Sequence, residues 1–559
     1  MEIYGKKCIE FISPHGQRAS RTKCFDQFSK LKRPAAVSAF SCLILCLLSS
    51  SVVRAEAITD PTSLSLLIDQ RISARWKAEN VTPAPVADDA EFMRRVYLDV
   101  TGKIPHASSV RDFLADDSLN KRQQLVEGLL ASPSYIIHYT NLWRAAMIPE
   151  ADADQQIRVA LPGFESWLRS RVAENRNFAE IVEEMLTLPF DQQAMLGLNQ
   201  LNQSTPVAFY QAKEAKPERL AAATSRLFLG IRLDCAQCHD HPFDSWKQDQ
   251  FWKYAAFFTD IPAAQVRGQE VVTRKESPGT IKIPELDRVV EATFLDRETA
   301  ISEGESRDRT VLAKWIVSSE NPYFAKAAVN RIWSYHFGIG LVEPMDDFSS
   351  SNPASHPELL DDLAEAFVAN DFDFKFLIRA ITSSKTYQLS SRQTDSSQEE
   401  PTLFARMPVR GMTAEQIFDS LSVATGYRQP FDPEQPLNFN NDQARQDFIA
   451  MFGNQTESAP DRASTVLQAL ALMNGDFVGD ATDIVESRTL AAIIDSPFLS
   501  DEQRVEAMYL STLSRFPSKI ERQEMLDYIK SNQADGSRPE SYADIFWVLL
   551  NSSEFLLNH

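Results

Sequence analysis

Apolar residues recur every three to four positions along most of the chain, which is the period at which one face of an α-helix repeats. Helix start signals support this pattern. Ser355-His356-Pro357-Glu358 is typical of a capping box that opens a helix at 357, and Asn321-Pro322 marks the start of a helix through Trp333. We therefore predict a mainly α, multi-helical protein. Clear examples of the periodic runs are SLLIDQRISARW (65–76), FESWLRSRVAENRNFAEIVEEML (164–186), LLDDLAEAFVAN (359–370) and AEQIFDSLSVATG (414–426).

Strict alternation of apolar and polar residues, which is typical of a half-buried strand, is scarce. The best example is VVTRKESPGTIKIP (271–284), which predicts a β-hairpin around Ser277-Pro278-Gly279. It falls in a charged, helix-poor stretch. We therefore predict two helical domains, 56–261 and 308–559, joined by a linker with a small β insertion at 262–307.

The N-terminus has the features of an export signal. Scattered Lys and Arg precede an apolar run, AAVSAFSCLILCLLSSSVV (35–53), which closes near Ala55. This order predicts a secretory signal peptide, residues 1–55, and an exported protein that is periplasmic or extracellular. An uncleaved N-terminal membrane anchor is the alternative, because a run of this length can just span a bilayer. No later segment is long and apolar enough to do so.

Removal of the signal leaves a strongly acidic chain. The whole sequence has a formal net charge of −20, and residues 1–55 hold nine of the 57 Lys and Arg but three of the 77 Asp and Glu. The remaining chain therefore carries −26. Such a surface repels nucleic acid and anionic lipid. We expect the partners to be a redox protein or an exported protein complex, and not nucleic acid.

Two of the six cysteines remain after signal removal, Cys235 and Cys238, both in CAQCHDHPFDSW (235–246). One local pair in a large exported chain does not make a disulfide scaffold. Amphipathic segments at 217–230 and 248–258 flank the motif, so we predict a loop held between two helices.

Cys-x-x-Cys-His is the sequence form of c-type haem attachment. In one helical turn the sulfurs of Cys235 and Cys238 face the same side and can bond the two vinyl groups of haem. His239 then falls beneath the iron as the axial ligand. His241 is too close in sequence to reach the opposite haem face, so its expected role is to bond a propionate or orient a carboxylate. Haem c is the favoured cofactor.

Two other interpretations use the same residues. A zinc or iron site would take His239 and His241, with Cys235, Cys238, Asp240 or Asp244 as alternative ligands. His138, His336 or His356 would have to complete it, although His336 lies on an apolar helix face typical of a core histidine. The third interpretation is a Cys235–Cys238 disulfide that stiffens a turn.

Other polar clusters are weaker. Glu343, Asp346, Asp347 and His356 lie in one segment, where acid–base or metal chemistry competes with plain solvated carboxylates. Arg331, Arg379 and Arg410 are candidate anion-binding residues, without a glycine-rich phosphate loop. The motifs G-x-S-x-G, H-E-x-x-H and the P-loop do not occur.

Two pairs of segments within the chain are similar in sequence. VYLDVTGKIPHASSVRDFL (96–114) aligns with MYLSTLSRFPSKIERQEML (508–526), and LLASPSYIIHY (129–139) aligns with LLNSSEFLLNH (549–559). Duplication of a helical unit and chance similarity between amphipathic helices both explain the match.

The chain resembles a family pairing, the planctomycete-specific cytochrome-like domain followed by the planctomycete-specific C-terminal domain. Both are domains of unknown function in exported bacterial proteins. The first resemblance rests on YLDVTGKIP, FLGIRLDCAQCHDHPFDSW and FWKYAAFF. The second rests on NPYFAKAAVNRIWSYHFGIGLVEPMDDFSSSNPASHPELLDDLAEAF, ITSSKTYQLSS, MTAEQIFDSL, LQALALMNGDFV and LLNSSEFLLNH.

The resemblance implies a part of a large exported system for polysaccharide breakdown or respiratory electron transfer. Three hypotheses follow. The first is a haem-binding or redox protein that uses Cys235, Cys238 and His239. The second is a metal-dependent extracellular enzyme or accessory protein in polysaccharide breakdown, with Glu343, Asp346 or Asp347 assisting. The third is a non-catalytic helical scaffold. We favour the first.

Overall fold

The structure, a computed structural model, describes residues 58–152, 154–190, 204–241, 244–261, 278–284, 286–296, 301, 304–428, 442–452, 476–532 and 538–559. Contacts divide the chain into two units, 1–56 and 57–559, and every described residue belongs to the second. The predicted signal peptide and its cleavage position lie outside the described residues. Among the described helices, none combines the length and the apolar character needed to cross a membrane.

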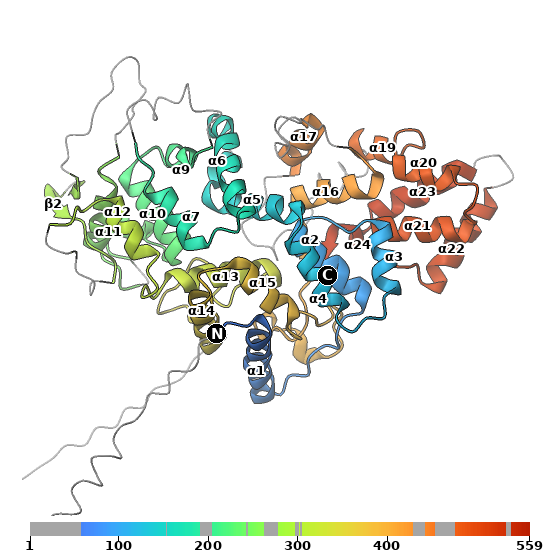
Figure 1. Cartoon of the computed structure of the whole chain (residues 1–559), viewed down its shortest axis with the longest axis horizontal. Helices are drawn as coiled ribbons and strands as arrows, with labels where there is room; N and C mark the ends of the chain where they lie inside the picture. Colours follow the sequence, from blue (N-terminus) through green and yellow to red (C-terminus); the bar gives the residue numbers. More distant parts are fainter. Residues whose placement is uncertain are drawn as a thin grey trace, which may run out of the picture. The chain divides into compact units, whose positions relative to one another are not determined.

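Helices make up most of the described chain, which confirms the predicted mainly α class (Figure 1). Those before the β insertion are α1 (Pro61–Glu79), α2 (Asp89–Thr101), α3 (Ala107–Ala115), α4 (Lys121–Leu130), α5 (Pro133–Met147), α6 (Gln155–Ala173), α7 (Phe178–Leu186), α9 (Val207–Ala212), α10 (Pro217–Leu229) and α11 (Gln248–Ala255). Short 3-10 helices among them are η1 (Pro149–Asp152), η2 (Asp234–Gln237) and η3 (Ala256–Phe258).

The helices after the insertion are α12 (Arg309–Ile316), α13 (Phe324–Phe337), α14 (Pro357–Ala369), α15 (Phe374–Ser383), α16 (Ala414–Thr425), α17 (Gln443–Phe452), α19 (Asp476–Thr482), α20 (Arg488–Asp495), α21 (Asp501–Thr512), α22 (Lys519–Ser531), α23 (Arg538–Leu550) and α24 (Ser553–Leu556). The 3-10 helices η4 (Ser396–Gln398) and η5 (Pro401–Leu403) lie between α15 and α16.

Local side-chain chemistry sets many helix starts. Thr413 accepts a hydrogen bond from the backbone N–H of Gln416, whose side chain bonds back to Thr413, so a capping box opens α16. The predicted start at 357 is confirmed, but the predicted capping box there is wrong. His356 is the N-cap and makes no side-chain cap bond. Glu358 instead pairs with Arg71 of α1.

The run 164–186 forms two helices, because Asn177 caps the start of α7 with a 2.8 Å bond from the backbone N–H of Glu180. The β insertion is present, and its described pairing is one that the sequence did not predict. Strand β1 (Thr280–Ile283) pairs antiparallel with β2 (Arg288–Glu291), so the turn follows the predicted strand. Residues 271–277, the other half of the predicted hairpin, lie outside the described residues.

Segments far apart in sequence pack together. Helix α1 lies against α14 and α15 (Figure 1), and Arg71 of α1 bonds Asp362 of α14 at 2.6 Å. Strand β3 (Arg410–Gly411) pairs with β4 (Leu557–Asn558) at the end of the chain. The larger apolar cluster holds residues from before and after the 262–307 insertion, including Leu64 and Met407. A buried core therefore continues across the predicted linker.

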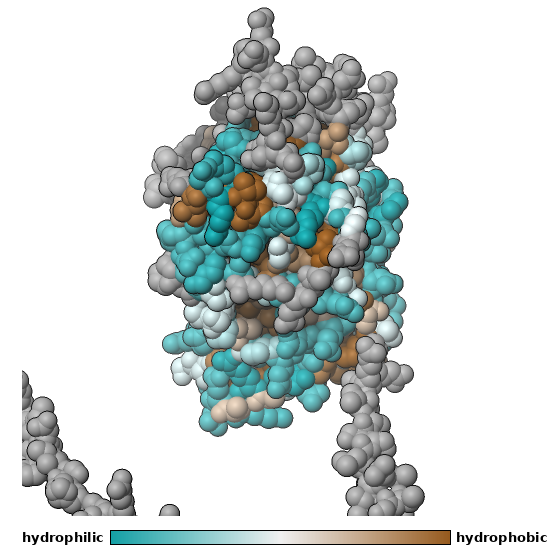
Figure 2. Space-filling view, turned by 90° about the vertical axis from the view of Figure 1, so that its left-hand side faces the viewer, coloured by the Kyte–Doolittle hydropathy of each residue, from teal (hydrophilic) through white to brown (hydrophobic). Residues whose placement is uncertain are grey.

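A second apolar cluster joins Leu98 and Ile104, at the end of α2, to residues from Met412 onward. Both clusters leave a polar exterior. Figure 2 views the side that carries α11, α12 and β2, and its coloured surface is mostly hydrophilic with separate small hydrophobic patches. This is the surface expected of a chain with a net charge of −20.

The structure supports the predicted internal repeat. Asp88 and Ser500, which correspond when the first alignment is extended toward the N-terminus without a gap, are the N-caps of α2 and α21. The paired positions Gly102 and Ser514 both have left-handed backbones, with φ of 72° and 60°. In the second matching stretch, Ser132 and Ser552 each accept a 3.2 Å bond from the backbone N–H three residues on. The two stretches thus share helix starts and turns, and not only apolar spacing. Helix α2 corresponds to α21, α3 corresponds to α22, and the start of α5 corresponds to the start of α24.

Candidate functional site

The two remaining cysteines lie on one exposed turn. Cys235 is in η2 and Cys238 is its C-cap, and both thiols are free and exposed. Side chains three residues apart nearly eclipse each other in a 3-10 helix. Ala236, between them, is fully buried and fixes the opposite side of the turn in the core. Both thiols are therefore exposed to solvent on a turn whose buried side is Ala236.

Helix α11 holds this turn in place. The side chain of Gln248 donates to the carbonyls of Gln237 at 3.2 Å and Cys238 at 2.9 Å. The indole N–H of Trp252 also donates to the Gln237 carbonyl, at 3.0 Å. These bonds satisfy carbonyls at the end of η2 that have no partner within so short a helix. The turn is thus braced by a packed helix, as expected for a loop that carries functional groups.

The chain enters the turn from α10, which ends at Gly230 in a left-handed conformation with φ of 66°. The Gly230 carbonyl accepts a 2.8 Å bond from the backbone N–H of Phe348, and a Cβ at Gly230 would overlap the Phe348 ring. The segment that holds Glu343, Asp346 and Asp347 therefore packs directly against the base of the turn.

His239 follows the second cysteine and is exposed. Its Nδ1 lies 2.7 Å from the Asp240 carbonyl. A carbonyl only accepts, so Nδ1 carries the proton and Nε2 keeps its lone pair. A backbone bond to one ring nitrogen is a common way to orient the other toward a metal. The ring is thus in the tautomer that ligates through Nε2.

The acidic side chains of the loop accept hydrogen bonds from backbone N–H groups. Asp240 accepts from the N–H of Gln248 at 3.0 Å and pairs with Lys247 at 3.0 Å. The bond from Gln248, with help from Lys247, lowers the pKa of this carboxyl below its usual value. Asp244 accepts from the N–H of Ser245 at 2.6 Å. Both carboxylates shape the loop.

The zinc or iron interpretation finds no ligand set. Within the described ranges, no three or more His, Cys, Asp or Glu side chains come together in a way that could hold a metal ion. His241 belongs to the loop through a 2.8 Å bond from its own N–H to the Trp246 carbonyl. Cys235, Cys238, His239 and His241 therefore do not converge as four ligands. Of the loop, Pro242 and Phe243 lie outside the described residues.

Of the other three candidate histidines, His336 and His356 are buried and His138 is partly buried. His336 is fully buried, and its Nδ1 donates to the Ile332 carbonyl at 2.8 Å, which confirms the core histidine predicted there. Burial lowers the pKa of His138 to about 4. Burial and the nearby Arg75 charge lower the pKa of His356 to about 4. All three are neutral at pH 7.

The predicted anion-binding arginines already have carboxylate partners. Arg331 pairs with Asp346, Arg379 bonds Glu127 at 2.7 Å, and Arg410 bonds Asp99 at 2.9 and 3.0 Å. These three side chains serve the fold. Glu343 accepts a 2.9 Å bond from the N–H of Gly340, so it too is used locally.

Asp99, in YLDVTGKIP, is a residue whose role sequence reasoning missed. It is buried and accepts bonds from Arg410, Tyr387 at 2.7 Å and Asn558 at 2.7 Å. It ties α2 to β3, to the chain after α15, and to β4 at the C-terminus. Its side-chain partners are at least 288 residues away, and the only local signal was an acid between the apolar residues Leu98 and Val100.

Two family models match the chain. PSCyt2, a protein of unknown function (DUF1549), matches residues 67–263, and PSD1, a protein of unknown function (DUF1553), matches residues 308–529. The chain belongs to the PSCyt2–PSD1 family pairing. This confirms the resemblance seen in the sequence. Searches of curated proteins and of solved structures returned no match.

The Cys-x-x-Cys-His turn lies inside the PSCyt2 match, and Asp99 of PSCyt2 binds Arg410 of PSD1. The two family matches are therefore joined by a buried ion pair in this chain. Neither description names an activity or a cofactor, so any function must come from the geometry.

Proposed function

We propose that this PSCyt2–PSD1 protein is an exported c-type haem protein that transfers electrons or senses a small ligand. Cys235 and Cys238 would hold the haem, and His239 would be its axial ligand through Nε2. The observation that carries the proposal is the state of these three side chains. The thiols are free and exposed on one turn, and His239 has Nδ1 bonded to a backbone carbonyl and Nε2 available.

Attachment adds each thiol S–H across one vinyl group of haem, so the two thiols must reach the porphyrin edge together. The three-residue spacing supports this, because Cys235 lies in η2 and Cys238 is its C-cap, and side chains three residues apart nearly eclipse each other in a 3-10 helix. Exposure matters equally, since haem must approach from outside the folded chain or during folding. When bound, haem supplies one-electron chemistry at its iron.

The bracing by α11 would fix the axial ligand relative to the thiols. Gln248 bonds both the Cys238 carbonyl, next to His239, and through its N–H the Asp240 side chain. Asp240 in turn supplies the carbonyl that orients His239. Gln248 thus supports the turn directly and supports the orientation of the His239 imidazole through Asp240.

The test is expression of the chain in a bacterial periplasm with haem-attachment machinery, followed by an absorbance spectrum and an intact mass under denaturing conditions. We expect a Soret band and a mass gain of one haem. Cys235→Ala and Cys238→Ala should lose covalent haem, and His239→Ala should keep the mass gain but change the spectrum. Ser245→Ala, an exposed change in the same loop, is the matched control and should match the parent.

A colourless chain whose mass equals the apoprotein would contradict the proposal. A mass two hydrogens lower would indicate a Cys235–Cys238 disulfide instead. Zinc or iron that co-purifies and is lost in Cys235→Ala would also overturn it, in favour of the metal interpretation.

A further inference from the structure

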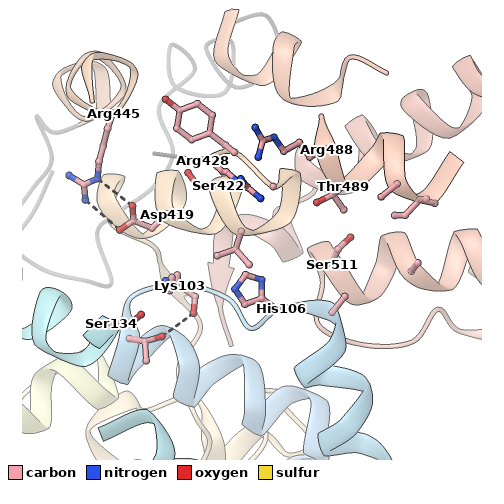
Figure 3. Close-up of a pocket in the computed structure, with 18 of the residues that line it drawn as sticks. Lys103, His106, Ser134, Asp419, Ser422, Arg428, Arg445, Arg488, Thr489 and Ser511 are labelled. Atoms are coloured by element: carbon pink, nitrogen blue, oxygen red, sulfur yellow. Dashed lines mark hydrogen bonds and ion pairs between the residues drawn. The ribbon is translucent and has the colours of Figure 1, made fainter. Parts of the chain in front are cut away.

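One cavity among the described residues shares no lining residue with the Cys-x-x-Cys-His turn. It has a volume of about 780 Å³. Its walls are the turn between α2 and α3, the start of α5, the end of α16, and helices α20 and α21 (Figure 3). Pockets of roughly 300–1,000 Å³ are typical of sites for small organic molecules. The cavity is therefore of the right size for such a ligand.

Its charge is opposite to that of the chain. Among the described residues, the lining carries four cationic side chains, Lys103, Arg428, Arg445 and Arg488, and one acidic side chain, Asp419. The chain as a whole has 57 Lys and Arg against 77 Asp and Glu. A concave wall of one charge sign concentrates ions of the other sign. In this acidic protein, the cavity is thus a local centre of positive potential.

Three of these cations are not neutralised within the described part of the chain. Asp419 accepts from Arg445 at 3.3 and 3.4 Å, and this pair is drawn in Figure 3. Lys103, Arg428 and Arg488 form no ion pair with any described residue. By contrast, Arg331, Arg379 and Arg410 each have a carboxylate partner. Cationic side chains that line a cavity and have no carboxylate partner are free to bind an anion.

The cations come from two facing walls. In Figure 3, Lys103 projects from the α2–α3 turn beside His106, and Arg428 and Arg488 come from the α16 and α20 side. Partial loss of water around His106 and the nearby Lys103 charge lower the pKa of His106. Its ring is therefore a neutral hydrogen-bonding group in the wall at pH 7.

The rest of the lining is mixed. The hydroxyls of Ser134 and Thr489 make no hydrogen bond to another described residue. Ile137, Val423 and Ile493 supply apolar surface between the charged walls. A bare inorganic ion would leave this apolar surface wet, whereas an organic anion would cover it.

We propose that this cavity binds a small organic anion, with an acidic group held by Arg428, Arg488 or Lys103 and an apolar body that lies on Ile137, Val423 and Ile493. The site is independent of the haem proposal, because it shares no lining residue with the turn at 235–246. It is built by both family matches, since Lys103 belongs to PSCyt2 and Arg428 and Arg488 belong to PSD1.

The test uses a fluorescent organic anion, anilinonaphthalene sulfonate, titrated into the full mature chain. Two compounds separate charge from shape. The uncharged analogue phenylnaphthylamine has the same aromatic rings, and sodium sulfate has the negative charge but no aromatic group. We expect saturable binding of the sulfonate at one site, weak binding of the analogue, and weak displacement by sulfate. Binding should also raise the unfolding temperature, because a ligand of the folded state stabilises it.

Arg428→Gln and Arg488→Gln should each weaken sulfonate binding about fivefold, and the double variant more, because each removes one partly screened charge. Lys77→Gln is the matched control, since Lys77 is an exposed lysine of α1 without an ion pair among the described residues. It should leave the affinity unchanged. Cys235→Ala should bind like the parent, which separates this result from the haem test.

Equal affinity of the double variant and Lys77→Gln would overturn the proposal. So would equal binding of phenylnaphthylamine, which would mean that the cavity selects apolar bodies without regard to charge. Complete displacement by sulfate at low concentration would show a site for inorganic anions only.

Discussion

Asp99 joins three distant parts of the chain through its carboxylate. Its carboxylate is 3% exposed and bonds Arg410, which is 6% exposed, so this ion pair is shielded from water. Tyr387 and Asn558 bond the same carboxylate. A buried charge left without its partner costs far more than a surface pair contributes.

Asp99→Ala should lower the free energy of unfolding by about 3–5 kcal/mol, because it leaves the Arg410 charge buried and unpaired. Asp361→Ala, which removes the exposed carboxylate partner of Lys326, should cost below about 1 kcal/mol. Urea denaturation measures both. The double variant Asp99→Leu/Arg410→Leu should recover part of the loss. A double variant less stable than Asp99→Ala would contradict the role of the unpaired charge.

Two histidines give the protein a dependence on pH. His138 and His356 have pKa values near 4 in the folded chain, against a usual value of 6.5. Between pH 6.5 and 4 the unfolded chain binds protons at these sites that the folded chain does not. Folding stability from this source is therefore full above pH 6.5 and falls as the pH drops to about 4.

His138→Gln and His356→Gln should each reduce this acid-dependent loss, by at most about 3 kcal/mol of unfolding free energy, because glutamine does not titrate. The measurement is urea unfolding at several pH values between 4 and 7. The difference between parent and variant should shrink as the pH falls. Parallel curves would show that these two imidazoles do not contribute.

At the scale of elements, the end of α10 shows how one residue type fixes a turn. Gly230 stops the helix with a left-handed backbone and lies against the Phe348 ring. The stop at Gly230 was predictable because glycine adopts this conformation without a Cβ penalty. The contact with Phe348 was not, because nothing near Gly230 in sequence signals it.

Gly230→Ala should destabilise the protein by about 2 kcal/mol or more, from the left-handed backbone and the overlap with Phe348. Gly128→Ala is its matched control. Gly128 lies inside α4, and a Cβ there would meet no atom within 4 Å. That change should stabilise by about 0.5–1 kcal/mol. Thermal unfolding monitored by circular dichroism distinguishes the two signs, and a stabilising Gly230→Ala would contradict the packing.

The predictions at this scale succeeded where the cause is local. The starts of α14 and α16, and the stop of α10, follow from residues within one turn. The β-hairpin prediction placed one strand correctly, 280–283, but did not anticipate its pairing with β2, because strand pairing depends on which neighbour is available to bond. The prediction of a capping box at 355–358 was wrong because the Glu358 side chain pairs with Arg71, on a helix almost 300 residues earlier.

At the scale of the whole molecule, the C-terminal residues bond directly to helix α2, near the start of the described chain. Arg94 of α2 donates to the carbonyls of Glu554 and Phe555, at 3.2 and 2.7 Å. Asn558 bonds Asp99, and Phe555 is fully buried. The C-terminal residues thus satisfy buried polar groups in a segment more than 450 residues earlier.

Deletion of residues 551–559 should cost at least about 4 kcal/mol, because it removes a buried aromatic residue and the two carbonyls that accept from Nη2 of Arg94. Hydrogen exchange read by mass spectrometry should show faster exchange in α2 as well as in α21–α23. Phe555→Ala is a milder variant that should show the same two regions. Faster exchange confined to the C-terminal helices would contradict this coupling.

The sequence by itself determined the helical class, many helix starts and stops, and the position of the Cys-x-x-Cys-His turn. These features depend on residues within a few positions of one another, so a single sequence contains their cause. The tertiary structure decided the partners of Asp99, the orientation of His239 and its support by α11, and the cationic cavity. Those depend on which distant segments are buried together, and burial strengthens each charge and hydrogen bond in a way that no local pattern of residues records.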